Sequence, residues 1–550
     1  MKKWRILHEL EDRKNIFHTL LANRGITQQA IDAFLHPNLA EVTLESVGID
    51  NKQLISLLKR LDSAKERNET IIIYGDYDVD GVTATAIVWE TLHGLGYQVH
   101  PYIPNRTDEG YGLSVKGIEN LLKTYPKATC IITVDNGIVA HEAVNFANEK
   151  NIDIIITDHH LPSEKVPQAY AILHTTKLCG AGVAWIVCKE ILKKVQDDKP
   201  NDHLSLIALA TVADLVPLTG TNRILLTYGL QELQKTKRPG LLALFQEAQI
   251  KTENIGVYEI GHVIAPRLNA MGRIASAMDS LRLLCTRNAQ RAKALALKLD
   301  TTNRERQLLT QVTSDGARNS VFQMTEKKKL LFLSDESYDE GIIGLVAGKM
   351  VEAFYRPTII VAKGLKISKG SARSVAGFNI IEFIRTAEHL LINAGGHPMA
   401  AGFTVATENL VTLQQHYEIL ADGQLTDGQL DRELVIDCVI PLQLVSQELF
   451  DEIHQLAPFG MGNKEPVFVS DVVVKDSILI GNGKKHLKLK VSQHKLPYAI
   501  DAIAFGMGEI GEAIKKGDMI SIAYTINENK WNGKKSLQLR VKDIKVQNKS

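Results

Sequence analysis

Short apolar runs recur in the first third of the chain, and each is followed directly by acidic or histidine side chains. The runs lie at 70–74 (TIIIY), 128–134 (ATCIITV) and 152–157 (IDIIIT). Continuous apolar runs of this length predict strands that are buried on both faces, as in a parallel sheet. Helix-like stretches separate them, including a predicted helix at 84–95. The alternation predicts a parallel α/β sheet whose polar strand ends meet at one edge, where such sheets bind ligands.

The remainder of the chain predicts further structured regions. Residues 277–325 have a mostly helical pattern and are highly charged. Within them the stretch ALALKLDTTNRERQLLTQV lacks glycine and proline and keeps an apolar stripe, which predicts a long connecting helix. A second α/β region follows, with strand-like runs at 328–335 and 356–362 on either side of a helical stretch. Beyond residue 465, five short strands separated by turn signals predict a small β-barrel. The first 45 residues are expected to be helical and then loop-like.

These patterns predict an α/β fold class with a barrel at the C-terminal end. The parallel-sheet core is joined by the long helix to the second α/β domain. The predicted segments are a helical extension at 1–45, the sheet domain at 46–225, a helical connector at 226–325, the second α/β domain at 326–425 and the barrel domain at 426–550.

Composition narrows the class of protein. The 550 residues are 45% hydrophobic and 23% charged, which excludes a disordered or collagen-like chain. The five cysteines form no Cys-x-x-Cys pair, so a zinc ribbon is not expected, and their sparse use fits a reducing compartment. The N-terminus lacks the apolar segment of a signal peptide, and no run reaches the roughly 18 apolar residues of a membrane span. We therefore expect a cytoplasmic protein with no membrane partner.

Charge is concentrated at the C-terminal end. The whole chain has a net charge of +1, whereas residues 471–550 contain 15 Lys and Arg against 8 Asp and Glu, a net of +7. This surplus is either an ordinary solvated surface or a module that binds a polyanion.

The first strand end contains three carboxylates in close succession. Asp76, Asp78 and Asp80 alternate at a period of two, with a glycine on each side. Ionised together, they repel one another and need a cation. Their oxygens are hard ligands that suit Mg²⁺ or Mn²⁺. A helix–loop–helix calcium site would need a glutamate at the twelfth position from Asp76, where Ile87 stands.

Further candidate ligands follow the other apolar runs. Asp135 and His159 follow the second and third strands, and Asp214 follows the apolar run LIALATVA. Asp214 either binds a metal or caps a helix. A mixed set of carboxylates and imidazole favours Mn²⁺ over Mg²⁺. The set is large enough for two ions, which together can hydrolyse a phosphoester.

A series of ordered motifs extends from about residue 70 to the end of the chain and resembles the DHH phosphoesterase superfamily, and within it the RecJ family of single-strand-specific exonucleases. The motifs are GDYDVDG, PNRTDEGYGL, VDNG, TDHH, LCGAGVAW, VADLVPL, PRLNAMGRI, NRERQ, KGSARS, GGHPMAAGF and LAPFGMGNKEPVF.

The resemblance implies roles for the strand-end residues. It implies two Mn²⁺ or Mg²⁺ ions with Asp135 as the bridge. The implied ligands are Asp76, Asp78, Asp80, Asp135, His159 and Asp214. His160 would contact the scissile phosphate or protonate the leaving oxygen, and Asp158 would orient a histidine.

The resemblance also implies roles in the second α/β domain, which corresponds to the DHH-associated domain. Gly395 and Gly396 would let the backbone approach a phosphate, and His397 would donate to that phosphate or to the leaving group.

A 5′-phosphate pocket is implied as well. Arg106, Ser371 and Arg373 would hold the 5′-terminal phosphate, which would explain cutting from that end. Arg267 and Arg273 either contact the strand backbone or form internal salt bridges.

The barrel resembles the oligonucleotide-binding (OB) fold of the family. Its aromatic residues either stack on bases or fill the barrel core. Trp531 is the foremost stacking candidate because it lies at a turn, and the others are Tyr498, Phe505 and Tyr524.

The resemblance therefore implies a single-stranded-DNA-specific 5′-to-3′ exonuclease that releases mononucleotides in DNA repair and recombination. A helicase and a single-strand-binding protein would be its partners. The alternatives are a DHH phosphodiesterase for short oligonucleotides or cyclic dinucleotides, a DHH-type pyrophosphatase, and a non-catalytic nucleic-acid-binding scaffold. A stacking groove tolerates both DNA and RNA, so that choice stays open.

Overall fold

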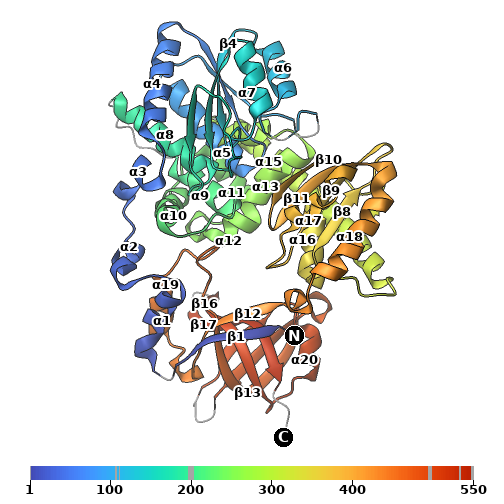
Figure 1. Ribbon diagram of the computed structural model, residues 1–550. Coiled ribbons are helices and arrows are strands. Elements are labelled where there is room, and N and C mark those ends of the chain that lie inside the picture. The colour runs from blue at the N-terminus through green and yellow to red at the C-terminus, as the bar shows by residue number, and fades with distance from the viewer. Residues whose placement is uncertain are drawn as a thin grey trace. The chain divides into compact units, whose positions relative to one another are not determined.

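The computed structural model describes residues 2–10, 12–105, 108–110, 112–195, 203–493, 498–531 and 534–546. The chain forms two compact units. Their helices and strands are labelled in Figure 1. We call the unit made of His36–Gln311 and Pro458–Asn463 the sheet unit. We call the unit made of Met1–Leu35, Val312–Ala457 and Lys464–Ser550 the barrel unit. The predicted segment boundaries stay predictions.

A five-stranded parallel sheet lies at the centre of the sheet unit, as the apolar runs predicted. Its spatial order is β3 (Val99–Tyr102), β2 (Thr70–Tyr74), β4 (Ala128–Val134), β5 (Asp153–Asp158) and β6 (Ala171–His174). Successive side chains of a strand point to opposite faces of the sheet, and here both faces are buried. Ile71 and Ile73 join one hydrophobic core, whereas Ile72 and Tyr74 join the other.

Helices cover both faces. The first face packs against α4 (Asn51–Glu66), α5 (Val79–Gly94), α8 (Gly180–Lys194) and α9 (Leu204–Ala213), and the second against α6 (Val115–Thr124) and α7 (His141–Glu149). The prediction that the helix after β2 begins at residue 84 is wrong, because α5 begins at Val79. Asp78 is its N-cap and accepts a hydrogen bond from the Gly81 amide at 3.0 Å. Aspartate is a strong N-cap, so the helix can begin inside the acidic motif, and Asp80 lies in its first turn.

The rest of the sheet unit is helical. Its remaining elements are α3 (Leu44–Val47), α10 (Gly220–Gln234), α11 (Pro239–Glu247), α12 (Val257–Glu259), a π-helical turn at Ile260–Ile264, α13 (Ala265–Ile274) and α14 (Met278–Cys285). The predicted long helix is present as α15 (Ala289–Phe322), which begins in this unit and ends in the barrel unit.

The barrel unit contains the second α/β region. Its sheet has the order β10 (Leu391–His397), β11 (Ala400–Ala406), β9 (Ile367–Arg373), β8 (Thr358–Ala362) and β7 (Leu331–Asp335). Its helices are α16 (Ile343–Phe354), α17 (Ile380–Arg385) and α18 (Leu410–Gln424). Strands β7 and β8 are parallel, and the other pairs are antiparallel.

The predicted barrel closes as five strands. In order of pairing they are β13 (Phe468–Ile480), β14 (His486–Ser492), β15 (Ile500–Ala504), β17 (Lys534–Val546) and β16 (Met519–Trp531), and β16 pairs back with β13. Strand β12 (Glu433–Val439) extends this sheet from β13. The short helices of the barrel region are α19 (Gln447–His454) and α20 (Gly508–Ala513).

The N-terminal segment departs from the prediction. Residues Lys3–Glu9 form strand β1, which pairs in parallel with β12, so the expectation of a wholly helical start is wrong. Helices α1 (Ile16–Asn23) and α2 (Ile31–Leu35) follow. Nowhere in the described part of the chain is a helix both long and apolar enough to cross a bilayer.

Candidate metal centre

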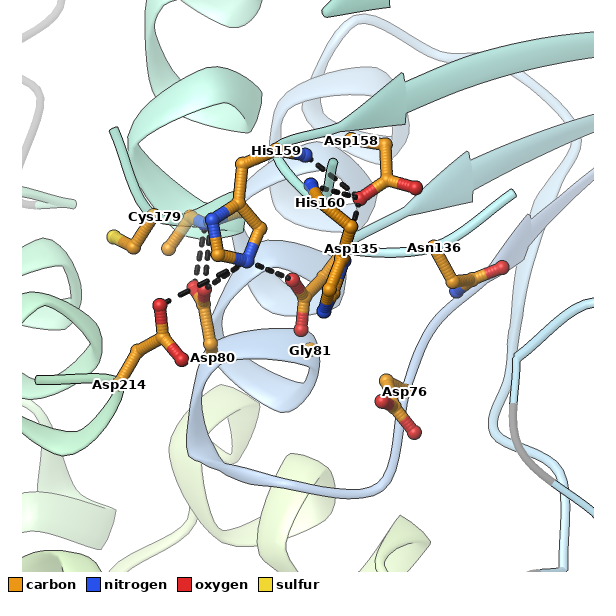
Figure 2. A network of polar contacts seen from close by, with 12 residues as sticks. Asp76, Asp80, Gly81, Asp135, Asn136, Asp158, His159, His160, Cys179 and Asp214 are labelled. Carbon is orange, nitrogen blue, oxygen red and sulfur yellow. Dashed lines mark hydrogen bonds and ion pairs between the residues drawn. The ribbon is translucent and has the colours of Figure 1, made fainter. Parts of the chain in front are cut away.

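Polar residues gather where three neighbouring strands of the sheet unit end. Asp76 follows β2, Asp135 follows β4, and Asp158 is the last residue of β5. Because the strands are parallel, these ends lie at one edge of the sheet, the usual ligand-binding edge of this architecture (Figure 2). Two further carboxylates come from helices: Asp80 from the first turn of α5, and Asp214 from the C-cap of α9.

The structure brings all six predicted ligands together. Three overlapping groups have ligand atoms within 4.8 Å of one another: Asp76, Asp78 and Asp135; Asp80, His159 and Asp214; and Asp135, His159 and His160. The Nε2 atom of His159 lies 3.1 Å from Asp135 Oδ1 and 3.7 Å from Asp80 Oδ2 and from Asp214 Oδ2. Asp135 thus belongs to two of the three groups, the one with Asp76 and Asp78 and the one with His159 and His160.

Crowding and burial act on the charges of this cluster. Burial and the neighbouring carboxylates raise the pKa of Asp135 well above its usual range. The same two causes raise the pKa of Asp80 to about 7 and that of Asp214 to about 8. Burial and the charge of His160 lower the pKa of His159 to about 4, so this imidazole is neutral, the form that binds metals.

The chemistry of the donors fits divalent cations. Asp135 Oδ1 is buried and accepts no hydrogen bond among the described residues, so a bound cation would supply the partner that this oxygen needs. Five carboxylates and one neutral imidazole are the ligand types of Mn²⁺ and, with fewer nitrogen donors, of Mg²⁺. The overlapping groups provide enough ligands for two ions.

Asp158 has a different environment from the candidate ligands. Its Oδ1 accepts hydrogen bonds from the backbone amides of His159 (2.7 Å) and His160 (3.1 Å), and its Oδ2 accepts one from Ile138 (2.9 Å). It also lies 2.8 Å from Nδ1 of His160. Burial alone would raise the pKa of Asp158, but these hydrogen bonds and the charge of His160 lower it. Asp158 therefore fixes the orientation of the His160 ring.

The pKa of His160 moves in the opposite direction. Burial lowers it, but the hydrogen bond with Asp158 and the charges of the surrounding carboxylates raise it to about 9.

Several positioning contacts were not foreseen from the sequence. The Asn136 side chain donates to the carbonyl oxygens of Tyr74 (3.3 Å) and Val134 (2.9 Å), which ties the ends of β2 and β4 together. The Asn269 side chain on α13 accepts from the backbone amide of Val79 (2.9 Å), between two of the candidate ligands. Both asparagines lie in motifs that the sequence analysis quoted, VDNG and PRLNAMGRI, but the motifs alone gave them no role.

The three arginines predicted in the sheet unit have different outcomes. Arg106 lies outside the described residues. Arg267 forms the internal ion pair that the sequence left as one of two alternatives: its Nε lies 2.9 Å from Asp300 Oδ1, and its Nη1 donates to Val263 O at 2.7 Å. Arg273 lies in the last turn of α13.

The predicted residues of the second α/β domain lie in the barrel unit. Ser371 and Arg373 are two residues apart on β9, with Arg373 Nη1 3.4 Å from Ser371 Oγ. Gly395, Gly396 and His397 form the end of the exposed strand β10.

The barrel aromatics divide into two classes. Tyr524 is fully buried, and its hydroxyl pairs with Ser470 Oγ at 2.8 Å, so it belongs to the core. Tyr498 and Phe505 are about half exposed, at 48% and 50%. Trp531 ends strand β16, and its side chain lies outside the described residues.

Comparison with known proteins gives consistent matches. Three family models match: the DHH family N-terminal domain at 70–211, the DHHA1 domain at 327–420 and the RecJ OB domain at 436–543. The single-stranded-DNA-specific exonuclease RecJ of Bacillus subtilis (strain 168) is 35% identical over 96% of this chain and 67% of its own length. The Haemophilus influenzae RecJ is 30% identical over 95% of this chain and 93% of its own length.

A solved structure matches over nearly the whole chain. The crystal structure of Thermus thermophilus RecJ in complex with Mn²⁺ superposes with a TM-score of 0.83 at 28% identity, covering 99% of this chain and 80% of that one. The chain therefore belongs to the RecJ family of single-stranded-DNA-specific exonucleases.

Proposed function

We propose that this protein is a metal-dependent exonuclease that removes mononucleotides from the 5′ end of single-stranded DNA. The observation that carries the proposal is the set of overlapping ligand groups at the carboxyl edge of the parallel sheet, in which Asp135 is shared by two groups and contacts His159 of the third at 3.1 Å. Asp76, Asp78 and Asp135 would hold one Mn²⁺ or Mg²⁺ ion. Asp80, His159 and Asp214 would hold the other, with Asp135 between the two.

The chemistry divides between the ions and the side chains. Two bound ions would activate a water and stabilise the leaving oxygen of the phosphodiester. The protein fixes His160 through Asp158, and the second nitrogen of that ring would then donate a hydrogen bond to the scissile phosphate or to the leaving oxygen. His397, with Gly395 and Gly396, would contact a phosphate of the same strand.

The polarity of cutting would come from a phosphate pocket on β9. A Cβ at Gly344, in the first turn of α16, would lie 3.0 Å from Ser371 Oγ and 3.1 Å from Arg373 Nη2. The hydroxyl, the guanidinium and the amino end of α16 thus converge on one place, an arrangement suited to a phosphate. This pocket would hold the 5′-terminal phosphate, and a role for Arg106 in the same contact stays a prediction.

The barrel would bind the strand. Its basic surplus suits a polyanion, and exposed Phe505 lies 5.6 Å below the Arg540 guanidinium, a pair on which a base could stack. Tyr498 and Trp531 are further stacking candidates, and Arg273 a contact to the strand backbone. We further propose a cytoplasmic enzyme of DNA repair and recombination that acts with a helicase and a single-strand-binding protein.

The test uses single-stranded DNA labelled at its 3′ end, with and without a 5′ phosphate, incubated with Mn²⁺, Mg²⁺ or EDTA. We expect progressive shortening from the 5′ end with either metal and none with EDTA. Asp135→Ala should abolish it, whereas Asp62→Ala should not, because Asp62 is an exposed residue of α4. Shortening from the 3′ end would refute the polarity. Binding of the DNA without shortening in either metal would favour the alternative of a non-catalytic nucleic-acid-binding scaffold.

A further inference from the structure

The amino end of helix α8 contacts the metal centre directly. The Gly180 amide donates to Asp80 Oδ2 and the Ala181 amide to Asp80 Oδ1, both at 2.6 Å. The first amides of a helix have no acceptor within the helix, and the Asp80 carboxylate supplies it. The positive end of the helix dipole and these two donors favour the ionised form of a carboxylate that is 2% exposed.

The lack of a side chain at Gly180 also lets α8 approach Asp135 closely. A Cβ placed on Gly180 would lie 2.5 Å from Asp135 Oδ1 and 2.6 Å from Asp135 Cβ. Real Cβ atoms essentially never approach heavy atoms this closely. Rotation about χ1 would move the carboxylate of Asp135 but would leave its Cβ in place, so the side chain alone cannot relieve the overlap.

Neither partner can shift easily. Asp135 has a φ of 63°, in the left-handed region, and its amide donates to Thr157 O at 2.9 Å, so its backbone is held in an uncommon conformation. On the other side, the nine residues from Gly180 to Cys188 of α8 are all buried. A tightly packed helix in a close-packed interior resists displacement.

We infer that Gly180 is a positioning residue of the metal centre. The amino end of α8 holds Asp80 through two amides and leaves room for Asp135 at residue 180. The lack of a side chain there sets the separation of these two carboxylates, and so the ability to hold two ions. This inference rests on the proposed function, and it gives a role to the motif LCGAGVAW.

The test compares Gly180→Ala with Gly182→Ala in the full-length protein. Gly182 lies in the same helix, and a Cβ there would lie 3.1 Å from Leu178 Cβ, which requires a shift of only a few tenths of an ångström, whereas at Gly180 the overlap with Asp135 is much closer. Mn²⁺ is titrated into each metal-free protein by calorimetry, and spin coupling between the ions is followed by electron paramagnetic resonance. We expect two ions and a spin-coupled signal in the wild type and Gly182→Ala. In Gly180→Ala one ion should bind at least about tenfold more weakly, and the coupled signal should be lost.

The two possible failures are distinguishable. If Gly180→Ala binds two ions with wild-type affinity and coupling, the inference is wrong, while the exonuclease assay on the wild type is untouched. If the wild type itself binds no ions and leaves DNA intact, the proposed function is wrong.

A measurement on the wild type covers the case in which Gly180→Ala does not fold. Cys179–Gly180 is the one Cys-Gly pair in the sequence. Labelling cysteine carbonyls with ¹³C and glycine nitrogens with ¹⁵N therefore selects the Gly180 amide in a carbonyl-edited spectrum. We expect this amide to be protected from solvent exchange and to shift on addition of Mg²⁺. An unprotected amide with no shift would overturn the inference.

Discussion

Replacing a ligand carboxylate by its amide should stabilise the metal-free protein and reduce the stabilisation that metal binding provides. Asp214 caps α9, and its ligand atom lies within 4.8 Å of those of Asp80 and His159. In the metal-free protein the two carboxylates repel each other. Asp214→Asn keeps the shape of the side chain and removes the charge, so it should stabilise the metal-free protein and weaken metal binding.

The magnitude follows from the geometry. Two unit charges 4.8 Å apart, at an effective dielectric constant of about 20, repel by about 3 kcal/mol. For the roughly 280 residues of the sheet unit, an unfolding entropy of about 2.1 cal/mol/K per residue means that each kcal/mol shifts Tm by about 2 °C, so the gain should be about 5–6 °C. Each ion present at 100 times its Kd should stabilise the wild type by about 2.7 kcal/mol.

The sign of the pH dependence is fixed by the direction of the pKa shift. Burial and the charges of Asp80 and Asp78 raise the pKa of Asp214 to about 8. A carboxyl whose pKa is raised on folding lowers stability progressively as the pH rises from about 4 to about 8. The advantage of Asp214→Asn should therefore be absent below about pH 4 and largest at pH 8 and above.

Differential scanning fluorimetry at pH 8 tests this, in EDTA and in excess Mn²⁺. We expect Asp214→Asn to melt above the wild type in EDTA and to gain less in Tm than the wild type on addition of Mn²⁺, whereas Asp62→Asn should follow the wild type in both conditions. A lower Tm for Asp214→Asn in EDTA would refute the argument from repulsion. An equal Mn²⁺ shift in both proteins would show that Asp214 is not a ligand.

Other substitutions test separate parts of the structure. Glu90→Gln removes the charge that pairs with buried Arg238 at 2.7 Å, so the free energy of unfolding should fall by roughly 3–5 kcal/mol. This loss should be measured as a lower Tm, and an unchanged Tm would contradict a buried ion pair. Asn269→Ala removes the acceptor of the Val79 amide, so Mn²⁺ affinity measured by calorimetry should fall with little loss of fold, whereas unchanged affinity would exclude a positioning role. Arg373→Ala should reduce the preference for 5′-phosphorylated over 5′-hydroxyl DNA, measured as a ratio of cleavage rates. An unchanged ratio would exclude the pocket.

Three of the five strands of the sheet unit, β2, β4 and β5, were predictable because their signal is local, whereas β3 and β6 were not predicted. Runs such as TIIIY are buried on both faces, and that burial is visible as unbroken hydrophobicity. The start of α5 was not predictable, because three aspartates at a period of two predict a loop as readily as a capped helix. The choice depends on the Asp78 hydrogen bond to the Gly81 amide.

Strand β1 shows the limit of local patterns. Its residues are exposed or half-buried, and the alternation of polar and apolar residues at 3–6 ends at Leu7, which is too short to indicate a half-buried strand. Its strand conformation comes from backbone pairing with β12, more than 400 residues away, as in the pairing of Lys3 with Glu433. Such pairing leaves no trace in the composition of one partner.

The residues that support the metal centre were also hidden by distance along the chain. The Asp80 carboxylate receives the amides of Gly180 and Ala181 from about 100 residues away, and the role of Gly180 comes from the closeness of Asp135. The sequence around Arg267 likewise left an internal pair and a DNA contact equally open, and the contact with Asp300 favours the internal pair.

The carboxylates of the centre differ in how many hydrogen bonds the protein provides to them, and a carboxylate with few hydrogen bonds is suited to bind a cation. Asp158 accepts three backbone amides and pairs with His160, and its pKa falls despite burial. Asp135 is equally buried, but its Oδ1 accepts no hydrogen bond in the described part of the chain and its pKa rises. Asp80 is intermediate, with two amides that lower its pKa against burial and the charge of Asp78. Burial of an unsatisfied carboxylate costs several kcal/mol, so a cation bound at Asp135 would offset a cost that the protein's own hydrogen bonds leave in place.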